Sequence, residues 1–211
     1  MKKIKTAKGR KTSSTRWLER QLNDPYVTKA KQLGYRSRAA FKIKEIDEKY
    51  NILKPGMYVV DLGAAPGGWC QIALEKGCTR IIGIDLLPID EMAGVLFMQK
   101  DFMDDDAPDL LKSALSGRAD IVMSDMAHNT TGHRETDHLK IMALVEAGYD
   151  FACEVLKHGG TYLAKTFQGG ADSELLARMK IDFTTVRHVK PKASRQDSSE
   201  MYVMATGFRK V

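Results

Sequence analysis

Cysteine and long apolar runs are both scarce in this sequence, and their scarcity excludes several classes of protein. No stretch reaches the roughly 18 consecutive apolar residues of a membrane-spanning helix, and residues 1–16 hold too few apolar side chains for a secretory signal. The three cysteines, Cys70, Cys78 and Cys153, form no C-x-x-C pair, and their odd number does not suit a disulfide framework. We therefore expect a cytoplasmic protein with free thiols, no structural zinc and no membrane partner.

Two glycine-rich signatures of phosphate binding are also missing, at the point where the sequence otherwise suits a nucleotide. The stretch Met57–Trp69 passes from an apolar run through a small-residue turn toward a helix, as nucleoside-binding loops of α/β domains do. A dinucleotide fingerprint starting at Gly63 would need glycine where Ala65 stands, and a P-loop would need a G-K-[ST] triplet. The loop is therefore predicted to hold a nucleoside without a pyrophosphate or triphosphate.

Two acids follow the next predicted strands and can complete such a pocket. Asp85 ends a strand 22 residues after Gly63, and Asp101 follows the third strand. The carboxyl ends of parallel strands meet at one rim, where a carboxylate can accept hydrogen bonds from ribose hydroxyls. Either acid alone is as readily a surface carboxylate, but their joint placement favours an adenosine with a short cationic substituent, S-adenosylmethionine.

Strands and helices alternate along the 211 residues, a length sufficient for one domain with a full core. Apolar runs predict strands at 57–62, 80–85, 95–98, 119–125, 160–166, 183–189 and 201–208. Helical periodicity and capping residues predict helices at about 15–22, 25–33, 38–50, 67–76, 107–115, 135–157 and 171–180. This order predicts an α/β fold, with a mainly parallel seven-stranded sheet, helices on both faces and an antiparallel hairpin at one edge.

Positive charge is concentrated at the N-terminal end of the chain. Residues 1–44 hold 14 Lys and Arg but only two acids, a net charge of +12, whereas residues 45–211 carry a net charge of −6. We expect residues 1–13 to be a disordered basic tail without the apolar face of a mitochondrial presequence, and 14–211 to be one domain with basic helices at 14–50. A merely solvated segment would also be basic, but interleaved aromatic residues favour a polyanionic partner.

Four further residues stand out by their positions. Asp125 ends the fourth predicted strand, Lys165 lies near the end of the fifth, and Glu200 precedes the last. Lys42 lies on the third basic helix. A lysine that closes an apolar strand is unusual because moving an ammonium group out of water is costly, although its head can also reach back into solvent. Position alone leaves both interpretations of Lys165 open.

Five motifs run through the chain in a fixed order: Y35-R-S-R-A-A-F-K42, V60-D-L-G-A-A-P-G-G-W69, M123-S-D-M-A, K165-T-F-Q-G and S198-S-E-M-Y202. In sequence and spacing they resemble the FtsJ (RrmJ) family of 2′-O-ribose methyltransferases, which act on bacterial large-subunit ribosomal RNA. The resemblance extends from about Thr15 to the C-terminus.

The resemblance implies a Rossmann-like methyltransferase fold, S-adenosylmethionine as the cofactor and an RNA-binding role for the basic helices. It implies a catalytic tetrad formed by Lys42, Asp125, Lys165 and Glu200. It implies cofactor contacts at Gly67, Trp69, Asp85, Asp101 and Asp125. The implied substrate is a uridine ribose in the A-loop of 23S-type rRNA, methylated on the large (50S) ribosomal subunit. Separately, we expect a monomer, because the sequence shows no heptad repeat and no sustained exposed apolar stripe.

The implied reaction is the attack of a ribose 2′-oxygen on a methyl carbon, and the hydroxyl must lose its proton as the new bond forms. We assign to Lys165 the role of the base that accepts this proton. A lysine is normally protonated at neutral pH, so a nearby cation such as Lys42 is needed to favour its neutral form, whereas Glu200 would oppose this effect. Asp125 would orient Lys165. The balance between Lys42 and Glu200 stays open at this point.

One position departs from the family pattern. Where D-M-A-P-N is usual, this chain has His128 in place of the proline. The replacement is either a tolerated loop change or a titratable group beside the substrate. We expect no metal site, because His128, His133 and His138 are five residues apart, whereas ligands on one helix face are three or four apart.

Three other functions are compatible with parts of the sequence. A 2′-O-methyltransferase of tRNA or of the mRNA cap would use the same tetrad, although the short basic module favours ribosomal RNA. A non-catalytic RNA-binding factor in ribosome assembly would retain the fold, but the intact tetrad argues against it. An NAD-dependent oxidoreductase is disfavoured by Ala65.

Overall fold

The strands of the computed structural model form a single sheet. The model describes residues 18–19, 21–128, 133–167, 173–195 and 198–210. The strands are β1 (Tyr58–Leu62), β2 (Arg80–Asp85), β3 (Val95–Gln99), β4 (Ala119–Ser124), β5 (Leu156–Phe167), β6 (Phe183–Val189) and β7 (Glu200–Phe208). They are ordered β3-β2-β1-β4-β5-β7-β6 across the sheet. All seven predicted strands are confirmed, and the largest difference in bounds is at the start of β5.

The sheet changes direction at one strand. β1 pairs in parallel with β2 and β4, β2 with β3, and β4 with β5. β7 runs antiparallel to both of its neighbours, β5 and β6. The predicted antiparallel hairpin is confirmed, but β7 lies inside the sheet and only β6 forms the edge. The insertion of β7 beside β5 brings the start of β7 to the end of the sheet where β5 finishes.

β5 begins four residues before its predicted start. Leu156 pairs with Ala119, and the regular pairing resumes with Thr161 opposite Ile121, so residues 157–160 form an irregularity in the ladder. From sequence, the glycines in this stretch indicate a loop between the preceding helix and the strand. The structure instead accommodates them within the strand, where one of them, Gly159, has a φ of +82°.

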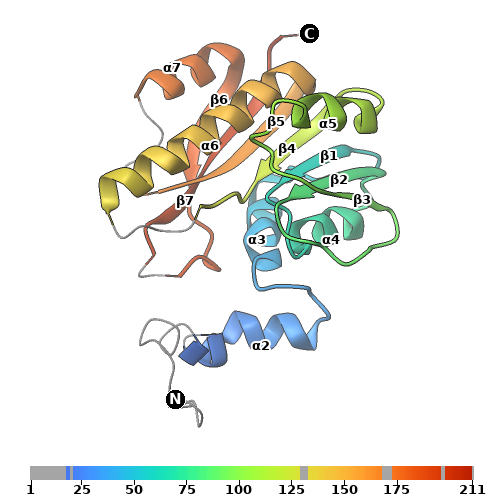
Figure 1. The fold of residues 1–211 in the computed structure, drawn as a ribbon, viewed down its shortest axis with the longest axis vertical. Helices are drawn as coiled ribbons and strands as arrows, with labels where there is room; N and C mark the ends of the chain where they lie inside the picture. The colour runs from blue at the N-terminus through green and yellow to red at the C-terminus, as the bar shows by residue number, and fades with distance from the viewer. Residues whose placement is uncertain (1–17, 20, 129–132, 168–172, 196–197, 211) are drawn as a thin grey trace.

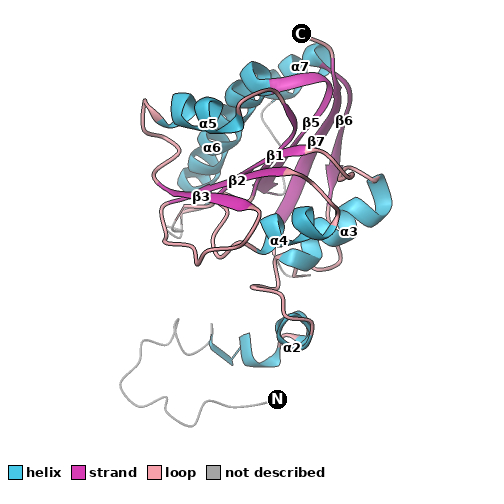
Figure 2. Cartoon of the chain, turned by 90° about the vertical axis from the view of Figure 1, so that its right-hand side faces the viewer, coloured by secondary structure: helices cyan, strands magenta, loops and turns pink. Residues whose placement is uncertain are grey.

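Helices cover both faces of the sheet, as predicted (Figure 1, Figure 2). They are α2 (Pro25–Gln32), α3 (Ala40–Tyr50), α4 (Gly68–Glu75), α5 (Ala107–Leu115), α6 (Arg134–Val155) and α7 (Ser173–Asp182). The last three lie on one face, α3 and α4 lie on the other, and α2 lies beyond α3. Residues 18–19 and 21–23 are also helical, whereas the expected tail at 1–13 lies outside the described residues. None of the described helices is long and apolar enough to cross a membrane.

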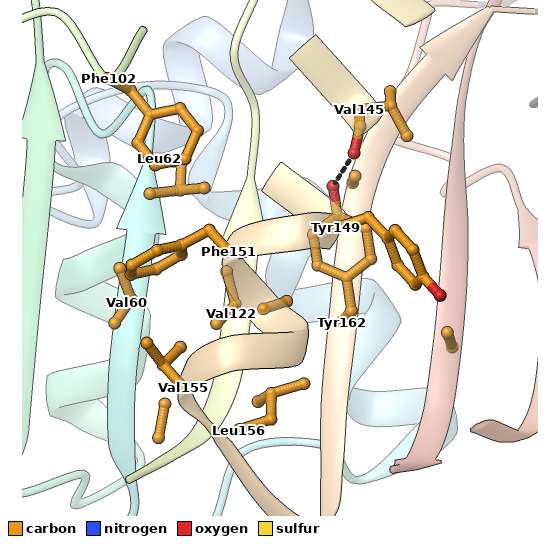
Figure 3. Close-up of a cluster of buried hydrophobic side chains, with 14 of the residues drawn as sticks. Val60, Leu62, Phe102, Val122, Val145, Tyr149, Phe151, Val155, Leu156 and Tyr162 are labelled. Carbon is orange, nitrogen blue, oxygen red and sulfur yellow. Dashed lines mark hydrogen bonds between the residues drawn. The ribbon is translucent and has the colours of Figure 1, made fainter. Parts of the chain in front are cut away.

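The core has two halves, one on each side of the sheet. Figure 3 shows side chains from the half between the sheet and α6, where the buried Tyr162 hydroxyl donates a 2.7 Å hydrogen bond to the Val145 carbonyl. In the other half, Ile43 of α3 and Ile72 of α4 join Val59 of β1 in one buried cluster. The two halves hold the sheet rigidly, and so fix the positions of the strand ends where functional side chains lie.

The basic helix α2 is tied to α3 by aromatic and ionic contacts. Asp24 caps α2 by accepting a 3.0 Å hydrogen bond from the Tyr26 backbone N–H, and its carboxylate also lies 3.0 Å from Arg38. The Tyr26 ring packs against Phe41, with 5.3 Å between the ring centres. Two cationic side chains, Lys29 and Lys31, lie in the last turn of α2. Helix α2 is therefore held beside the helix that carries Lys42.

One carboxylate lies inside the core. Asp61 of β1 is fully buried; one of its oxygens accepts a 3.2 Å hydrogen bond from the Cys70 thiol, and the other has no hydrogen-bond partner among the described residues. Burial raises the pKa of Asp61 to about 7; the Cys70 hydrogen bond opposes this effect, and repulsion from Asp125 and Asp85 adds to it. The folded protein therefore keeps Asp61 protonated well into the range where a solvated aspartate is ionised.

Replacing Asp61 by asparagine should stabilise the fold progressively as the pH rises. An unfolded aspartate has a pKa of about 3.9, so from there to about pH 7 only the folded wild type retains the proton, and its stability falls with rising pH. Asp61→Asn lacks this penalty. Relative to wild type, its free energy of unfolding in urea should increase by on the order of 3 kcal/mol between about pH 4.5 and about pH 8.

Asp105 provides the control for this measurement, because its carboxylate is exposed. Asp105→Asn should leave the difference from wild type the same at both pH values. A pH-independent difference for Asp61→Asn would show that the folded protein does not hold a proton on this residue.

Candidate active site

The four residues of the predicted tetrad meet at one end of the sheet. Asp125 directly follows β4, and Lys165 lies near the end of the neighbouring parallel strand β5. Glu200 begins β7, which is antiparallel to β5 and therefore starts at the same end, opposite Phe167. Lys42 reaches this point from α3. The structure thus brings together all four side chains that the sequence singled out.

Ion pairs join the four side chains into one cluster. The Nζ atom of Lys42 lies 2.8 Å from Glu200 Oε2 and 3.7 Å from Asp125 Oδ2. The Nζ atom of Lys165 lies 3.1 Å from Asp125 Oδ1 and donates a 2.6 Å hydrogen bond to the Asp125 carbonyl oxygen. Each side chain is only between 9% and 18% exposed, so salt and water screen these charges weakly.

Asp125 is the negative centre of the cluster. Burial disfavours its ionised form, but the ammonium groups of Lys165 and Lys42, together with the Tyr202 hydroxyl, outweigh burial and lower the pKa of Asp125 below its usual value. The carboxylate is therefore ionised at neutral pH. It holds together two cations that would otherwise repel each other.

Tyr202 is a fifth member of the cluster that sequence reasoning did not assign. Its hydroxyl donates a 2.9 Å hydrogen bond to Asp125 Oδ1, and its ring lies 5.8 Å from Lys42 Nζ. Burial raises the pKa of Tyr202 well above its usual value, so the hydroxyl remains a donor. Its position two residues after Glu200 was the available signal, because alternate residues of a strand face the same side.

Glu200 is fixed by a second, unpredicted partner. The Ser194 hydroxyl donates a 2.8 Å hydrogen bond to Glu200 Oε1, while Lys42 occupies the other oxygen. Ser194 is buried and lies in the segment between β6 and β7. This partner could not be found from spacing, because its position depends on how the connecting segment folds back over α3.

A cavity of about 240 Å³ opens beside the cluster, between the loops that follow β1, β2, β3 and β4. Three of the five predicted cofactor residues, Asp85, Asp101 and Asp125, line it. Its wall also contains apolar side chains, among them Leu87 and Phe102. Asp125 is therefore part of both the cavity and the lysine cluster.

The loop after β1 is shaped by close backbone contacts. A Cβ atom at Gly63 would lie 2.8 Å from the Met126 backbone, so only glycine allows the loops after β1 and β4 to approach this closely. Asp85 fixes the same loop, because its Oδ2 accepts a 2.8 Å hydrogen bond from the Ala65 N–H. Its Oδ1 accepts a 2.8 Å hydrogen bond from the Leu87 N–H. The acid thereby orders both sides of the cavity mouth.

The other two predicted cofactor residues, Gly67 and Trp69, do not line this cavity. Trp69 is buried in α4, where its indole N–H donates a 2.9 Å hydrogen bond to the Ala39 carbonyl and its ring packs on Tyr202 at 5.7 Å. Gly67 precedes α4 with a φ of +101°, and a Cβ there would meet the Arg36 guanidinium. That these two residues contact a cofactor stays a prediction.

His128 points toward the start of α6. Its Nε2 atom lies 3.1 Å from the Asp137 carbonyl oxygen at the start of that helix. Among the described residues, no group of three or more His, Cys, Asp or Glu side chains is arranged to hold a metal ion. The contact with α6 gives the residue that replaces the family proline a structural position in the loop after β4.

Comparison with known proteins identifies a family. The model of the FtsJ-like methyltransferase family matches residues 35–208. A relative from Bradyrhizobium diazoefficiens, described as ribosomal RNA large subunit methyltransferase E, is 65% identical and covers 98% of this chain and 92% of its own length. A relative with the same description from Paramagnetospirillum magneticum is 61% identical over 98% of this chain and 88% of its own length.

A solved structure supports the same conclusion. The crystal structure of a ribosomal RNA methyltransferase from Plasmodium falciparum matches with a TM-score of 0.73 and 34% identity, over 84% of this chain and 100% of that one. The family match includes all seven strands and every residue of the lysine cluster. The chain, with its Rossmann-like seven-stranded sheet, belongs to the FtsJ-like methyltransferase family.

Proposed function

We propose that this protein transfers a methyl group from S-adenosylmethionine to the 2′-oxygen of a uridine ribose in the A-loop of large-subunit ribosomal RNA. The observation that carries the proposal is the double position of Asp125, in the cavity wall and in the lysine cluster. A donor in the cavity and an acceptor at the lysines would meet beside this carboxylate. The description of the relatives supports ribosomal RNA as substrate, and the resemblance of the motifs supports the uridine.

The cavity residues suit the parts of S-adenosylmethionine. Each oxygen of Asp85 accepts one backbone N–H and retains a lone pair for a ribose hydroxyl. Leu87 and Phe102 supply apolar surface for a purine ring. Asp125 places negative charge where the cationic end of the cofactor would lie. Asp101, whose Oδ1 accepts a 2.9 Å hydrogen bond from the Met103 N–H, adds a second fixed carboxylate to the rim.

The lysine cluster is suited to activating a ribose hydroxyl. The cofactor supplies a methyl group on a sulfonium, and its departure as a neutral thioether requires no metal. When a ribose 2′-hydroxyl attacks that methyl group, Lys165 would take the hydroxyl proton. Lys42 stabilises the negative charge that develops on the oxygen. Glu200 and Asp125 hold the two ammonium groups in place.

The resting contacts define what must change before Lys165 can accept a proton. Its Nζ atom donates a hydrogen bond to the Asp125 carbonyl oxygen and contacts the carboxylate of the same residue. Lys42 contacts the other carboxylate oxygen. A ribose hydroxyl at the cluster would have to replace at least one of the contacts of Lys165 before this residue can take its proton.

The substrate assignment can be tested by comparing RNAs. The purified protein should transfer labelled methyl groups to large subunits from cells that lack it, and transfer little to tRNA or capped mRNA under the same conditions. Preferred methylation of tRNA or capped mRNA would instead support one of the alternative 2′-O-methyltransferases. Absence of transfer to every RNA would favour a non-catalytic role.

Replacing Lys165 by alanine should reduce methyl transfer by at least about 100-fold, because the base is lost. The affinity for S-adenosylmethionine, measured by calorimetry, should stay close to that of the wild type, because Lys165 does not line the cavity. Lys157→Ala is a matched control on the same strand, because this lysine is exposed and pairs with Asp120 at the opposite end of β5. Substantial methylation by Lys165→Ala would refute the assignment of the base.

Replacing Tyr202 by phenylalanine should lower kcat about tenfold, since Asp125 loses a hydrogen bond that helps to position its carboxylate. Tyr162→Phe is the matched control, because it removes a buried hydroxyl from the neighbouring strand β5, where it bonds Val145 in the core. Both variants should lose a similar amount of stability, about 1 kcal/mol. If the two variants showed equal kcat values, Tyr202 would have only a structural role.

A further inference from the structure

A second cavity, of about 550 Å³, lies between the C-terminal half of α3 and the chain that follows β6. Its wall contains three lysines, Tyr50 and His188, together with two glutamates and three apolar residues. Arg187 of β6 lies beside this wall, because its guanidinium reaches the Tyr50 ring. We call the following residues the basic groove: Lys49, Tyr50, Arg187, His188, Lys190 and Lys192.

Tyr50 gathers two of these cations without neutralising them. The Nζ atom of Lys49 lies 5.1 Å from the centre of its ring, and the guanidinium carbon of Arg187 lies 5.5 Å from it. A cation–π contact leaves the full positive charge in place, whereas a carboxylate would cancel it. The ring therefore concentrates positive charge on one side of the groove.

Three cations of the groove have no acidic partner among the described residues. Within the part of the chain that the structure describes, Lys49, Arg187 and Lys192 form no ion pair with a carboxylate. On the opposite face of the sheet, Arg178 of α7 pairs with two acids of α6, and Lys112 of α5 also has two acidic partners. The charge of the groove is therefore left for a partner from outside the chain.

Two acids of α3, Glu45 and Glu48, border the groove, and both carboxylate oxygens of Glu45 accept hydrogen bonds from other parts of the chain. Glu45 accepts a 3.0 Å hydrogen bond from the Tyr26 hydroxyl and a 2.8 Å hydrogen bond from the Ala193 N–H. The exposed Glu48 is the other acid in the wall. Lys190 donates a 2.8 Å hydrogen bond to the Ser198 carbonyl, which fixes its position and keeps its charge. The groove therefore has a clear positive excess.

The groove and the candidate active site share helix α3. Lys42 and Lys49 are seven residues apart on α3, so they lie on the same side of the helix and about 10 Å apart along its axis. The chain that leaves the groove reaches Ser194, which holds Glu200 of the lysine cluster. An RNA strand that places a ribose at Lys42 would therefore pass the groove within a few nucleotides.

We propose that the basic groove binds the sugar–phosphate backbone of the substrate RNA next to the target nucleotide, with phosphates at Lys49, Arg187 and Lys192. This proposal rests on the proposed function for the identity of the RNA. It adds a second contact surface to the N-terminal basic helices. This surface could not be recognised from the charge distribution of the sequence, because Lys49, Arg187 and Lys192 lie in residues 45–211, which carry a net charge of −6.

The test compares two triple variants that remove the same charge. The groove variant is Lys49→Gln, Arg187→Gln and Lys192→Gln, and the control is Lys112→Gln, Lys157→Gln and Lys180→Gln, three lysines away from the groove. Binding to unmodified, transcribed large-subunit ribosomal RNA is measured over a series of KCl concentrations. Losing three phosphate contacts should reduce the slope of log Kd against log [KCl] by about 2. The control should keep the wild-type slope, and both should retain wild-type affinity for S-adenosylmethionine.

An unchanged slope in the groove variant, or an equal loss in the control, would overturn the proposal. Weaker binding of the groove variant to intact large subunits with a wild-type slope on RNA would assign the groove to a ribosomal protein instead, which also overturns it. Methyl transfer by the wild type is measured separately. A groove-dependent slope without any transfer would support the groove and reject the proposed function, so the two failures are distinguishable.

Discussion

The position of the Asp125 carboxylate is the constraint on which the rest of the site depends. It is held from one side by Lys165 and Tyr202 and from the other by Lys42, and it also faces the cavity. Two ammonium groups could not remain this close at low solvent exposure without a shared counter-charge. The same charge suits a cationic methyl donor. A single carboxylate therefore connects the region proposed for the donor with the region proposed for the acceptor.

The topology of the sheet makes this arrangement available. Parallel strands deliver Asp125 and Lys165 to one rim because β4 and β5 are neighbours. No further parallel crossover is needed to complete the cluster, because the antiparallel β7 enters from the same end and presents Glu200 and Tyr202 beside β5. The connecting segment before β7 then folds over α3, so it both holds Glu200 and forms one wall of the basic groove. The candidate active site and the proposed RNA contact thus share one segment of the chain.

Much of this fold could be predicted, because helices, strands and caps are set by local patterns. The acids at the strand ends could also be grouped, since parallel strands share a rim. The position of β7 inside the sheet could not be derived, because antiparallel order depends on pairing between distant segments. For the same reason the contact of the Tyr202 hydroxyl with Asp125 could not be predicted, because it depends on the pairing of β7 with β5. Gly67 and Trp69 were assigned from motifs alone, and neither lines the cavity that contains the acids.

The central claim is that this site methylates a ribose oxygen through Lys165. It is tested most directly by mapping the product on large-subunit RNA from cells that lack the protein, after incubation with the purified enzyme and S-adenosylmethionine. The account predicts one new 2′-O-methyluridine, located in the A-loop. Methylation of a base, or of a ribose outside the A-loop, would contradict it.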